Sequence, residues 1–173
     1  MEENRTDPEQ VKFEKISILI PVFNEAETVE SLFNSVQEVS MPLHKEIIIV
    51  DDGSMDGTSD IVEKLVKQYS GIILIKNHKN CGKGFSIRQG IEAATGQIIL
   101  IQDADLEYDP EDYNRLLRPI LEGDADAVYG SRFISGSAKR VLYFRHYLGN
   151  RILTFFSNLF SDFNLSDMVI AIH

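Results

Sequence analysis

Apolar positions along the chain follow two alternating patterns. Short unbroken apolar runs are typical of buried parallel strands, and apolar residues at i, i+3, i+4 and i+7 are typical of amphipathic helices. Strands are expected over residues 16–22, 46–50, 72–76, 97–102 and 125–129. Helices are expected over residues 24–39, 59–69, 86–95 and 112–122. This alternation predicts an α/β fold, a mostly parallel sheet with helices on both faces.

Two of the helix starts carry specific signals. Asn24 is a candidate N-cap for the first helix, with Glu25 and Glu27 in its first turn. Asp109 and Pro110 form a start signal for the helix at 112–122. Both signals predict where a helix begins.

Acids and turn residues follow three of the first four strands, at 21–25, 51–56 and 103–107. In a parallel sheet the carboxyl ends of the strands meet at one edge, where ligands bind. We therefore expect these three segments to lie together. Unrelated surface loops would not all be acidic at the same edge.

The segment after the fourth strand carries the strongest chemical signal. Asp103, Asp105 and Glu107 are spaced by two residues, so an extended segment would point them the same way. Carboxylates together with phosphate oxygens suit Mg²⁺ or Mn²⁺. The alternative is a solvated acidic loop that caps the next helix.

A nucleotide diphosphate carrying a leaving group would fit these residues. Asp51, Asp52 and Glu25 could accept hydrogen bonds from ribose hydroxyls or a base edge. Lys83 between two glycines, and Arg132, are cationic candidates for the phosphates. Each residue also has a structural alternative, as a turn residue, a solvated lysine or an arginine in a structural ion pair.

Composition narrows the class of protein. The chain has 173 residues, enough for one domain with a full core, and its formal charge of −10 argues against nucleic acid as a partner. A single cysteine, Cys81, excludes an internal disulfide and a multi-cysteine metal site, and it fits a reducing compartment. The first fifteen residues are polar and do not form a signal peptide, and no apolar run is long enough to span a membrane.

Five motifs in series between residues 16 and 132 together resemble a family 2 glycosyltransferase of the GT-A fold, which is Rossmann-like. They are PVFNE at 21–25, VDDGSMDGT at 50–58, NCGKG at 80–84, DADL at 103–106 and GSR at 130–132. The most similar subgroup is the dolichyl- or polyprenyl-phosphate mannose and glucose synthases. The resemblance implies inverting, metal-assisted transfer of a hexose from UDP-glucose or GDP-mannose to a polyprenyl or dolichyl phosphate.

The resemblance also implies roles for individual residues. Asp103, Asp105 and Arg132 would be catalytic, and Asp105 and Glu107 would bind Mg²⁺ or Mn²⁺. The nucleotide-sugar-binding residues would be Pro21, Phe23, Asn24, Glu25, Asp52, Gly53, Ser54, Lys83, Asp103 and Ala104. Glu107 stands where the subgroup often has glutamine, and its added charge could tighten metal binding or change the preferred metal.

The expected organisation is a polar arm at 1–15, a catalytic domain at 16–144 and an amphipathic aromatic helix with a shortened end at 145–173. Basic residues beside the aromatic face of 145–163 suit a helix lying in a membrane surface. The alternative is a core helix or a homo-oligomer contact. The subgroup continues with further helices beyond 167–168, so an incomplete acceptor site is expected.

Several functions remain open from the sequence. A lipid-phosphate acceptor implies a cytoplasmic protein held peripherally at the cytoplasmic face of the membrane. One alternative is a transferase acting on a polysaccharide or glycan, and another is a nucleotide-sugar-binding module without turnover. A nucleotidyltransferase is disfavoured, because no glycine-rich loop follows the first strand.

Overall fold

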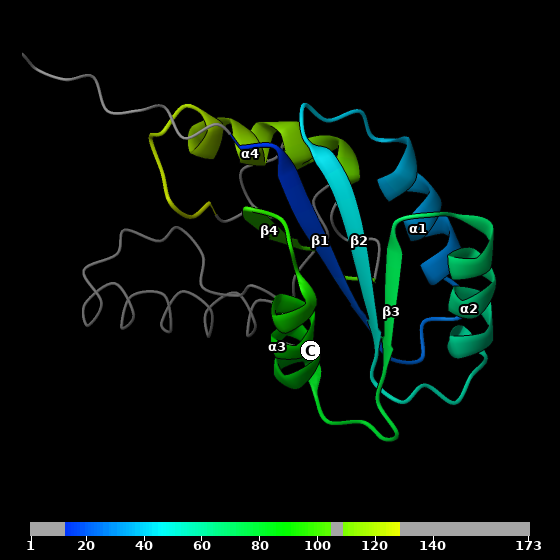
Figure 1. The fold of residues 1–173 in the computed structure, drawn as a ribbon. Helices are drawn as coiled ribbons and strands as arrows, with labels where there is room; N and C mark the ends of the chain where they lie inside the picture. Colours follow the sequence, from blue (N-terminus) through cyan, green and yellow to red (C-terminus); the bar gives the residue numbers. More distant parts are fainter. Residues whose placement is uncertain (1–12, 105–108, 129–173) are drawn as a thin grey trace, which may run out of the picture. The chain divides into compact units, whose positions relative to one another are not determined.

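Four strands and four α-helices alternate along the part of the chain that the structure describes, residues 13–104 and 109–128 of a computed structural model (Figure 1). The strands are β1 (Lys15–Val22), β2 (His44–Asp51), β3 (Ile72–Lys76) and β4 (Ile98–Ile101). The helices are α1 (Val29–Glu38), α2 (Thr58–Gln68), α3 (Lys83–Ala93) and α4 (Tyr113–Leu121), with a short 3₁₀ turn (Pro110–Asp112) before α4. All these elements belong to one compact unit, Met1–Ala127.

The strands form one parallel sheet in the order β3-β2-β1-β4. The chain runs outward from β1 to β3, then returns to the other side of β1 for β4. This reversal places the carboxyl ends of β1 and β4 next to each other, with Leu19 opposite Ile101. In open α/β sheets such a switch point is where ligands bind.

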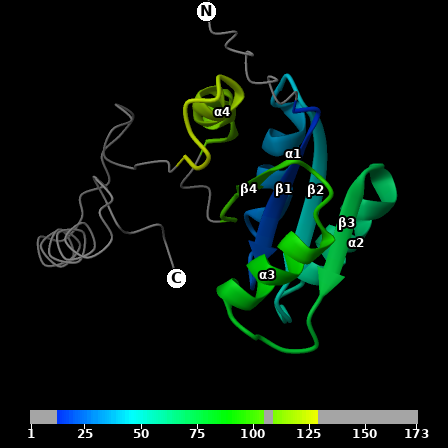
Figure 2. The same cartoon turned by 60° about the vertical axis from the view of Figure 1, so that its left-hand side comes forward.

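Helices cover both faces of the sheet, as the unbroken apolar strands predict (Figure 2). On one face, Ile18 and Ile20 of β1 pack in a core that includes residues of α1, α2 and α4. On the other face, Leu19 packs with Ile48 and Val50 beside the end of α3. Neighbouring residues of β1 therefore serve different cores, because side chains alternate along a strand.

The first helix begins later than the sequence predicts. It starts at Val29 with Thr28 as its N-cap residue, so Asn24 is not the cap and Glu27 lies before the first turn. Asn24 instead takes a left-handed backbone with φ of 56°, and its side-chain oxygen accepts a hydrogen bond from the Met55 amide at 2.9 Å. The side chain that would cap the helix is used to join two loops.

The strand expected at 125–129 does not form over residues 125–128, and Tyr129 lies outside the described residues. The backbone amides of Asp124 and Ala125 both donate to the Pro119 carbonyl, which wraps the chain around the end of α4. By contrast, the helix start at Asp109 is confirmed, because its side chain accepts from the Glu111 amide at 3.0 Å. Within the described ranges no helix is long and apolar enough to cross a membrane.

Candidate active site

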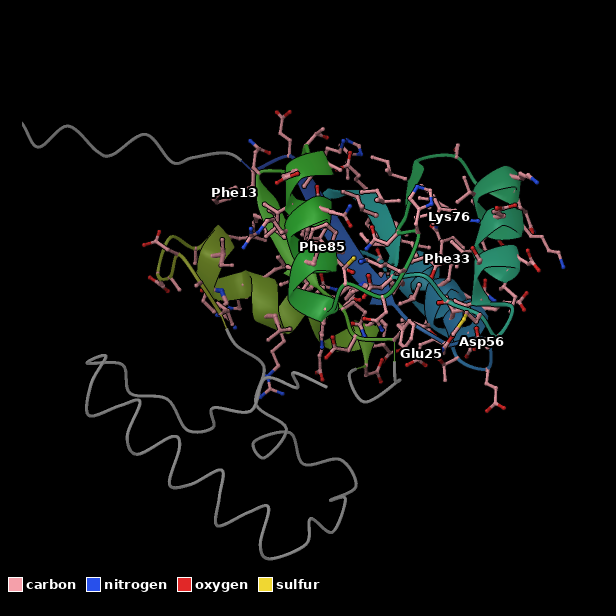
Figure 3. All side chains as sticks on the ribbon, turned by 90° about the horizontal axis from the view of Figure 1, so that it is seen from below. Phe13, Glu25, Phe33, Asp56, Lys76 and Phe85 are labelled. Carbon is pink, nitrogen blue, oxygen red and sulfur yellow. The ribbon has the colours of Figure 1, made fainter. Side chains whose placement is uncertain are left out.

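Two loops at the carboxyl edge of the sheet, 23–28 after β1 and 52–57 after β2, are joined by hydrogen bonds. The Asn24 amide donates to the Ser54 hydroxyl at 3.0 Å, and the Ala26 amide donates to Asp56 Oδ2 at 3.0 Å. Figure 3 looks onto this edge and labels Glu25 and Asp56 on it. The acids after β1 and β2 therefore lie together, as expected.

The carboxylate of Asp52 holds the loop that leads from β3 into α3. It is 3% exposed and accepts hydrogen bonds from Asn77 Nδ2 at 2.7 Å, the Gly82 amide at 2.7 Å and the Cys81 amide at 3.0 Å. Burial raises the pKa of Asp52, but these hydrogen bonds together lower it by more, so the net pKa is below its usual range. Asp52 therefore stays ionised and fixes residues 77–82.

Gly53 allows this loop to approach closely. Its φ is 77°, and a Cβ atom there would lie 2.7 Å from the carbonyl carbon of Lys79. No side chain fits between these two backbones without a shift. The sequence marks Gly53 as a turn residue, but only the structure gives the contact that requires glycine.

A cleft of about 340 Å³ opens beside Gly53 at the carboxyl ends of β1, β2 and β3. Its lining includes Phe23, Gly53 and Ser54 together with residues 76–80. The aromatic ring and the polar loop offer a stacking surface and hydrogen-bonding groups together. Three residues predicted to bind a nucleotide sugar thus share one cleft.

Lys83 and Asp103 form an ion pair, with Nζ 2.5 Å from Oδ1. Lys83 begins α3 and Asp103 follows β4, so the pair joins two elements beside the β1–β4 switch point. The two side chains are 21% and 10% exposed. A charge pair so shielded from water interacts more strongly than one on the open surface.

The other predicted residues lie in varied settings. Pro21 is half-buried in β1 opposite Val50, and Ala104 is buried in the core. Glu25 is half-buried, and its carboxylate accepts a hydrogen bond from the Thr28 hydroxyl at 2.6 Å. Asp105, Glu107 and Arg132, and the segment 145–163, lie outside the described residues.

The predicted metal site falls partly on those residues. Among residues 13–104 and 109–128, no three acidic, histidine or cysteine side chains are grouped to hold a metal ion. Asp103 supplies a carboxylate at the right edge, and Asp105 and Glu107 follow it closely in the chain. Carboxylate oxygens of this kind fit Mg²⁺ or Mn²⁺ chemically.

Sequence reasoning missed two residues, Gln102 and Tyr113. Both are 2% exposed, and the Tyr113 hydroxyl donates to Gln102 Oε1 at 2.7 Å. A glutamine at the end of an apolar strand, directly before the acidic segment, is the signal that could have indicated a buried polar contact. No local sequence pattern indicates that Tyr113, eleven residues later, is its hydrogen-bond partner.

Comparisons with known proteins identify the family. The profile of glycosyl transferase family 2 matches residues 17–171. A dolichol-phosphate mannosyltransferase from Pyrococcus furiosus is 34% identical over 70% of this chain and 34% of its own length. An undecaprenyl-phosphate 4-deoxy-4-formamido-L-arabinose transferase from Serratia proteamaculans is 34% identical over 63% of this chain and 34% of its own length.

A solved structure agrees with these sequence relatives. The mannosyltransferase of Pyrobaculum calidifontis, in complex with GDP-Man and Mn²⁺, is 26% identical with a TM-score of 0.51. The match covers 58% of this chain and 30% of that one, so the chain spans about a third of these relatives. The expected GT-A architecture is confirmed. The chain belongs to glycosyl transferase family 2.

Proposed function

We propose that this chain binds a nucleotide diphosphate sugar and transfers its hexose, with inversion, to a polyprenyl phosphate. The observation that carries the proposal is the Lys83–Asp103 pair, which lies at the carboxyl edge of the sheet in a family 2 chain. Two relatives are named as transferases acting on dolichol phosphate and undecaprenyl phosphate. These names support a lipid phosphate as the acceptor.

The cleft is proposed as the nucleoside site. Phe23, Gly53 and Ser54 line it and would contact the base and ribose. Glu25 and Asn24 come from the neighbouring loop, and Pro21 shapes its start. Asp52 would contribute both by holding the segment 77–82, of which residues 77–80 line the cleft, and by placing negative charge near the ribose hydroxyls.

The diphosphate and the sugar are proposed to lie near Lys83 and Asp103. The Lys83 ammonium is a suitable partner for phosphate oxygens, and Asp103 and Ala104 would contact the donor. Asp105 and Glu107 would hold Mg²⁺ or Mn²⁺, as the complex of the Pyrobaculum relative with Mn²⁺ supports. When bound, such an ion supplies Lewis-acid stabilisation of the departing diphosphate.

Inversion requires one displacement. An oxygen of the acceptor phosphate forms a bond to the anomeric carbon while the bond from that carbon to the diphosphate breaks. The electron pair leaves with the nucleotide diphosphate, next to Lys83. A phosphate oxygen is already ionised near neutral pH, so the nucleophile needs no strong base. Arg132 is proposed to hold a phosphate during this step.

The domain limits and location are proposed together. Residues 16–144 would form the catalytic domain, and residues 145–173 would lie at the cytoplasmic surface of the membrane. The sequence of this segment, rich in aromatic residues and containing Arg145 and Arg151, supports this, because basic aromatic segments bind anionic lipid surfaces. A polyprenyl acceptor must be reached from the bilayer.

Calorimetric titration with UDP and GDP, each with and without Mn²⁺, tests the donor site. We expect one nucleotide to bind, and to bind more tightly with metal. Lipid-dependent transfer would then separate a polyprenyl-phosphate acceptor from a glycan acceptor. Binding without any transfer would favour a nucleotide-sugar-binding module, and failure of both nucleotides to bind would contradict the proposed donor site.

A further inference from the structure

The buried pair of Gln102 and Tyr113 connects the core to the acidic segment. Gln102 is the first residue after β4, and its backbone amide donates to the Leu19 carbonyl at 2.9 Å. Its side chain is 2% exposed and faces Tyr113, the first residue of α4. The contact joins two elements that flank the acidic segment in the sequence.

Both the nitrogen and the oxygen of the Gln102 side-chain amide form hydrogen bonds. Its Nε2 donates to the backbone carbonyl of Asp103 at 2.9 Å, and its Oε1 accepts from the Tyr113 hydroxyl at 2.7 Å. The Tyr113 ring lies in the main core with Leu117. A chain of two hydrogen bonds therefore runs from the core to the peptide of Asp103.

The direction of the Tyr113 hydrogen bond is fixed over the working pH range. Burial, and then the charge of Asp109, raise the pKa of the Tyr113 phenol above its usual range. The phenol therefore keeps its proton and can donate. The Asp103 carbonyl can only accept, so the Gln102 side-chain nitrogen faces it and the amide oxygen is left to accept from Tyr113.

Asp103 is thus held at three points. Its carboxylate pairs with Lys83, its carbonyl accepts from Gln102, and the next residue, Ala104, is buried in the core. Asp103, Lys83 and Ala104 are all predicted site residues, whereas Gln102 was not predicted. The last two contacts set where the Asp103 carboxylate can lie relative to Lys83.

We propose that Gln102 and Tyr113 are positioning residues of the transferase site, which act by fixing the Asp103 backbone so that its carboxylate meets Lys83. This inference rests on the proposed function for its effect on catalysis. Its structural part concerns the protein without ligands. The two parts can therefore fail separately.

The test uses Tyr113→Phe, which removes one hydroxyl and keeps the ring in the core. The first readout is amide exchange of Gln102 and Asp103 in the ligand-free protein, by residue-resolved NMR. We expect the backbone N–H of Gln102, which donates to the Leu19 carbonyl, to exchange roughly fivefold to tenfold faster. This is the factor that corresponds to the loss of one net hydrogen bond, here the bond that anchors the Gln102 side chain. Tyr69→Phe, a hydroxyl deletion on a ring that packs against Phe33, is the matched control.

The second readout separates positioning from a general loss of stability. We expect kcat of Tyr113→Phe to fall about tenfold, the lower end for residues that orient the groups of a reactive site. Affinity for the free nucleotide should change less than about twofold, because residues from other strand ends line the cleft. Gln102→Leu should lower kcat at least as much, since it removes both hydrogen bonds.

The double variant Gln102→Leu/Tyr113→Phe decides whether the two residues act as one unit. We expect its kcat to match that of Gln102→Leu, because a shared interaction is lost only once. Additive losses, or a Tyr113→Phe protein with wild-type exchange at Gln102 and wild-type kcat, would overturn the proposal. If the wild-type chain transfers no sugar, the proposed function fails, and the exchange data alone still decide whether Tyr113 holds the Asp103 peptide.

Discussion

Lys83 Nζ lies 2.5 Å from Asp103 Oδ1, although 20 positions separate the two residues in the sequence. The contact forms because α3 begins at the edge where β4 ends, next to β1. The pair is the meeting point of the two motifs that the sequence marks as phosphate-binding and acidic. The diphosphate and the sugar of the donor are proposed to lie near this pair.

Replacing Lys83 with glutamine should lower kcat/KM for the nucleotide sugar by about 100-fold, typical of losing one preorganised group that stabilises developing charge. The neutral amide can still donate a hydrogen bond, but it cannot balance Asp103 or the departing diphosphate. Steady-state kinetics with varied donor measures the effect. Lys64→Gln on the exposed surface of α2 is the control, and equal effects of the two substitutions would contradict a special role for Lys83.

Gly53→Ala should destabilise the fold by roughly 1–3 kcal/mol, because it forces a side chain into a left-handed backbone. Its methyl group would also press on the backbone of Lys79 and displace the wall of the cleft. Thermal unfolding and nucleotide titration should both show the loss.

Gly84→Ala is the matched control for that substitution. Gly84 lies in α3, and a methyl group added to it would meet no atom within 4 Å apart from its chain neighbours and the backbone of its own helix. Alanine there should be neutral or stabilising by up to about 1 kcal/mol. Equal destabilisation by the two variants would show that the Gly53–Lys79 contact has no special weight.

Glu46 makes stability depend on acid pH. It is buried at the opposite end of the strands, where it accepts from the Ser17 hydroxyl at 2.6 Å, the Thr95 amide at 2.9 Å and Lys15 Nζ at 2.5 Å. Burial raises the pKa of Glu46, but the hydrogen bonds from Lys15, Ser17 and Thr95 lower it to about 2. The folded state therefore favours the ionised carboxylate.

The sign of the pH effect follows from that lowered pKa. The stabilising contribution of Glu46 is present above its unfolded pKa of about 4.5 and is lost as pH falls towards about 2. Glu46→Gln should cost about 2 kcal/mol at pH 7, the scale of hydrogen bonds to a charged group, and less at pH 3. Urea unfolding at both pH values measures this difference. Glu63→Gln, which breaks the exposed pair with Lys76, should change stability little.

Asp105→Asn tests the proposed metal role directly. The substitution keeps the size of the side chain but removes its charge, so the increase in nucleotide affinity on adding Mn²⁺ should disappear. Affinity without metal should stay the same. Calorimetric titration measures both, with Asp60→Asn in α2 as control. A metal effect that survives in Asp105→Asn would contradict the assignment.

Local patterns were sufficient for most of the fold. The unbroken Ile47–Val50 run and the similar apolar runs elsewhere in the chain predict buried parallel strands. The acidic residues that follow these runs predict that the site lies at the carboxyl edge of the sheet. Local patterns failed where a contact between residues far apart in the sequence determines the local structure. Asn24 bonds to Met55 instead of capping α1, and no local pattern signals that bond.

Part of the candidate site could likewise be predicted from the sequence, and part of it could not. Residue types and order indicated the phosphate-binding and acidic segments, so Lys83 and Asp103 were both candidates. That they pair with each other depends on the strand order, which places β4 beside β1. The use of Asp52 to hold residues 77–82 likewise depends on where the β3–α3 loop folds back.

The proposed reaction is the transfer of a hexose to a lipid phosphate. The most direct test incubates this chain with radiolabelled GDP-mannose or UDP-glucose, Mn²⁺, and vesicles with or without polyprenyl phosphate. We expect labelled lipid only when polyprenyl phosphate is present, and none with Lys83→Gln at matched short times. Label that appears on a glycan acceptor instead, or no lipid product with either donor although the nucleotide binds, would contradict transfer to a lipid phosphate.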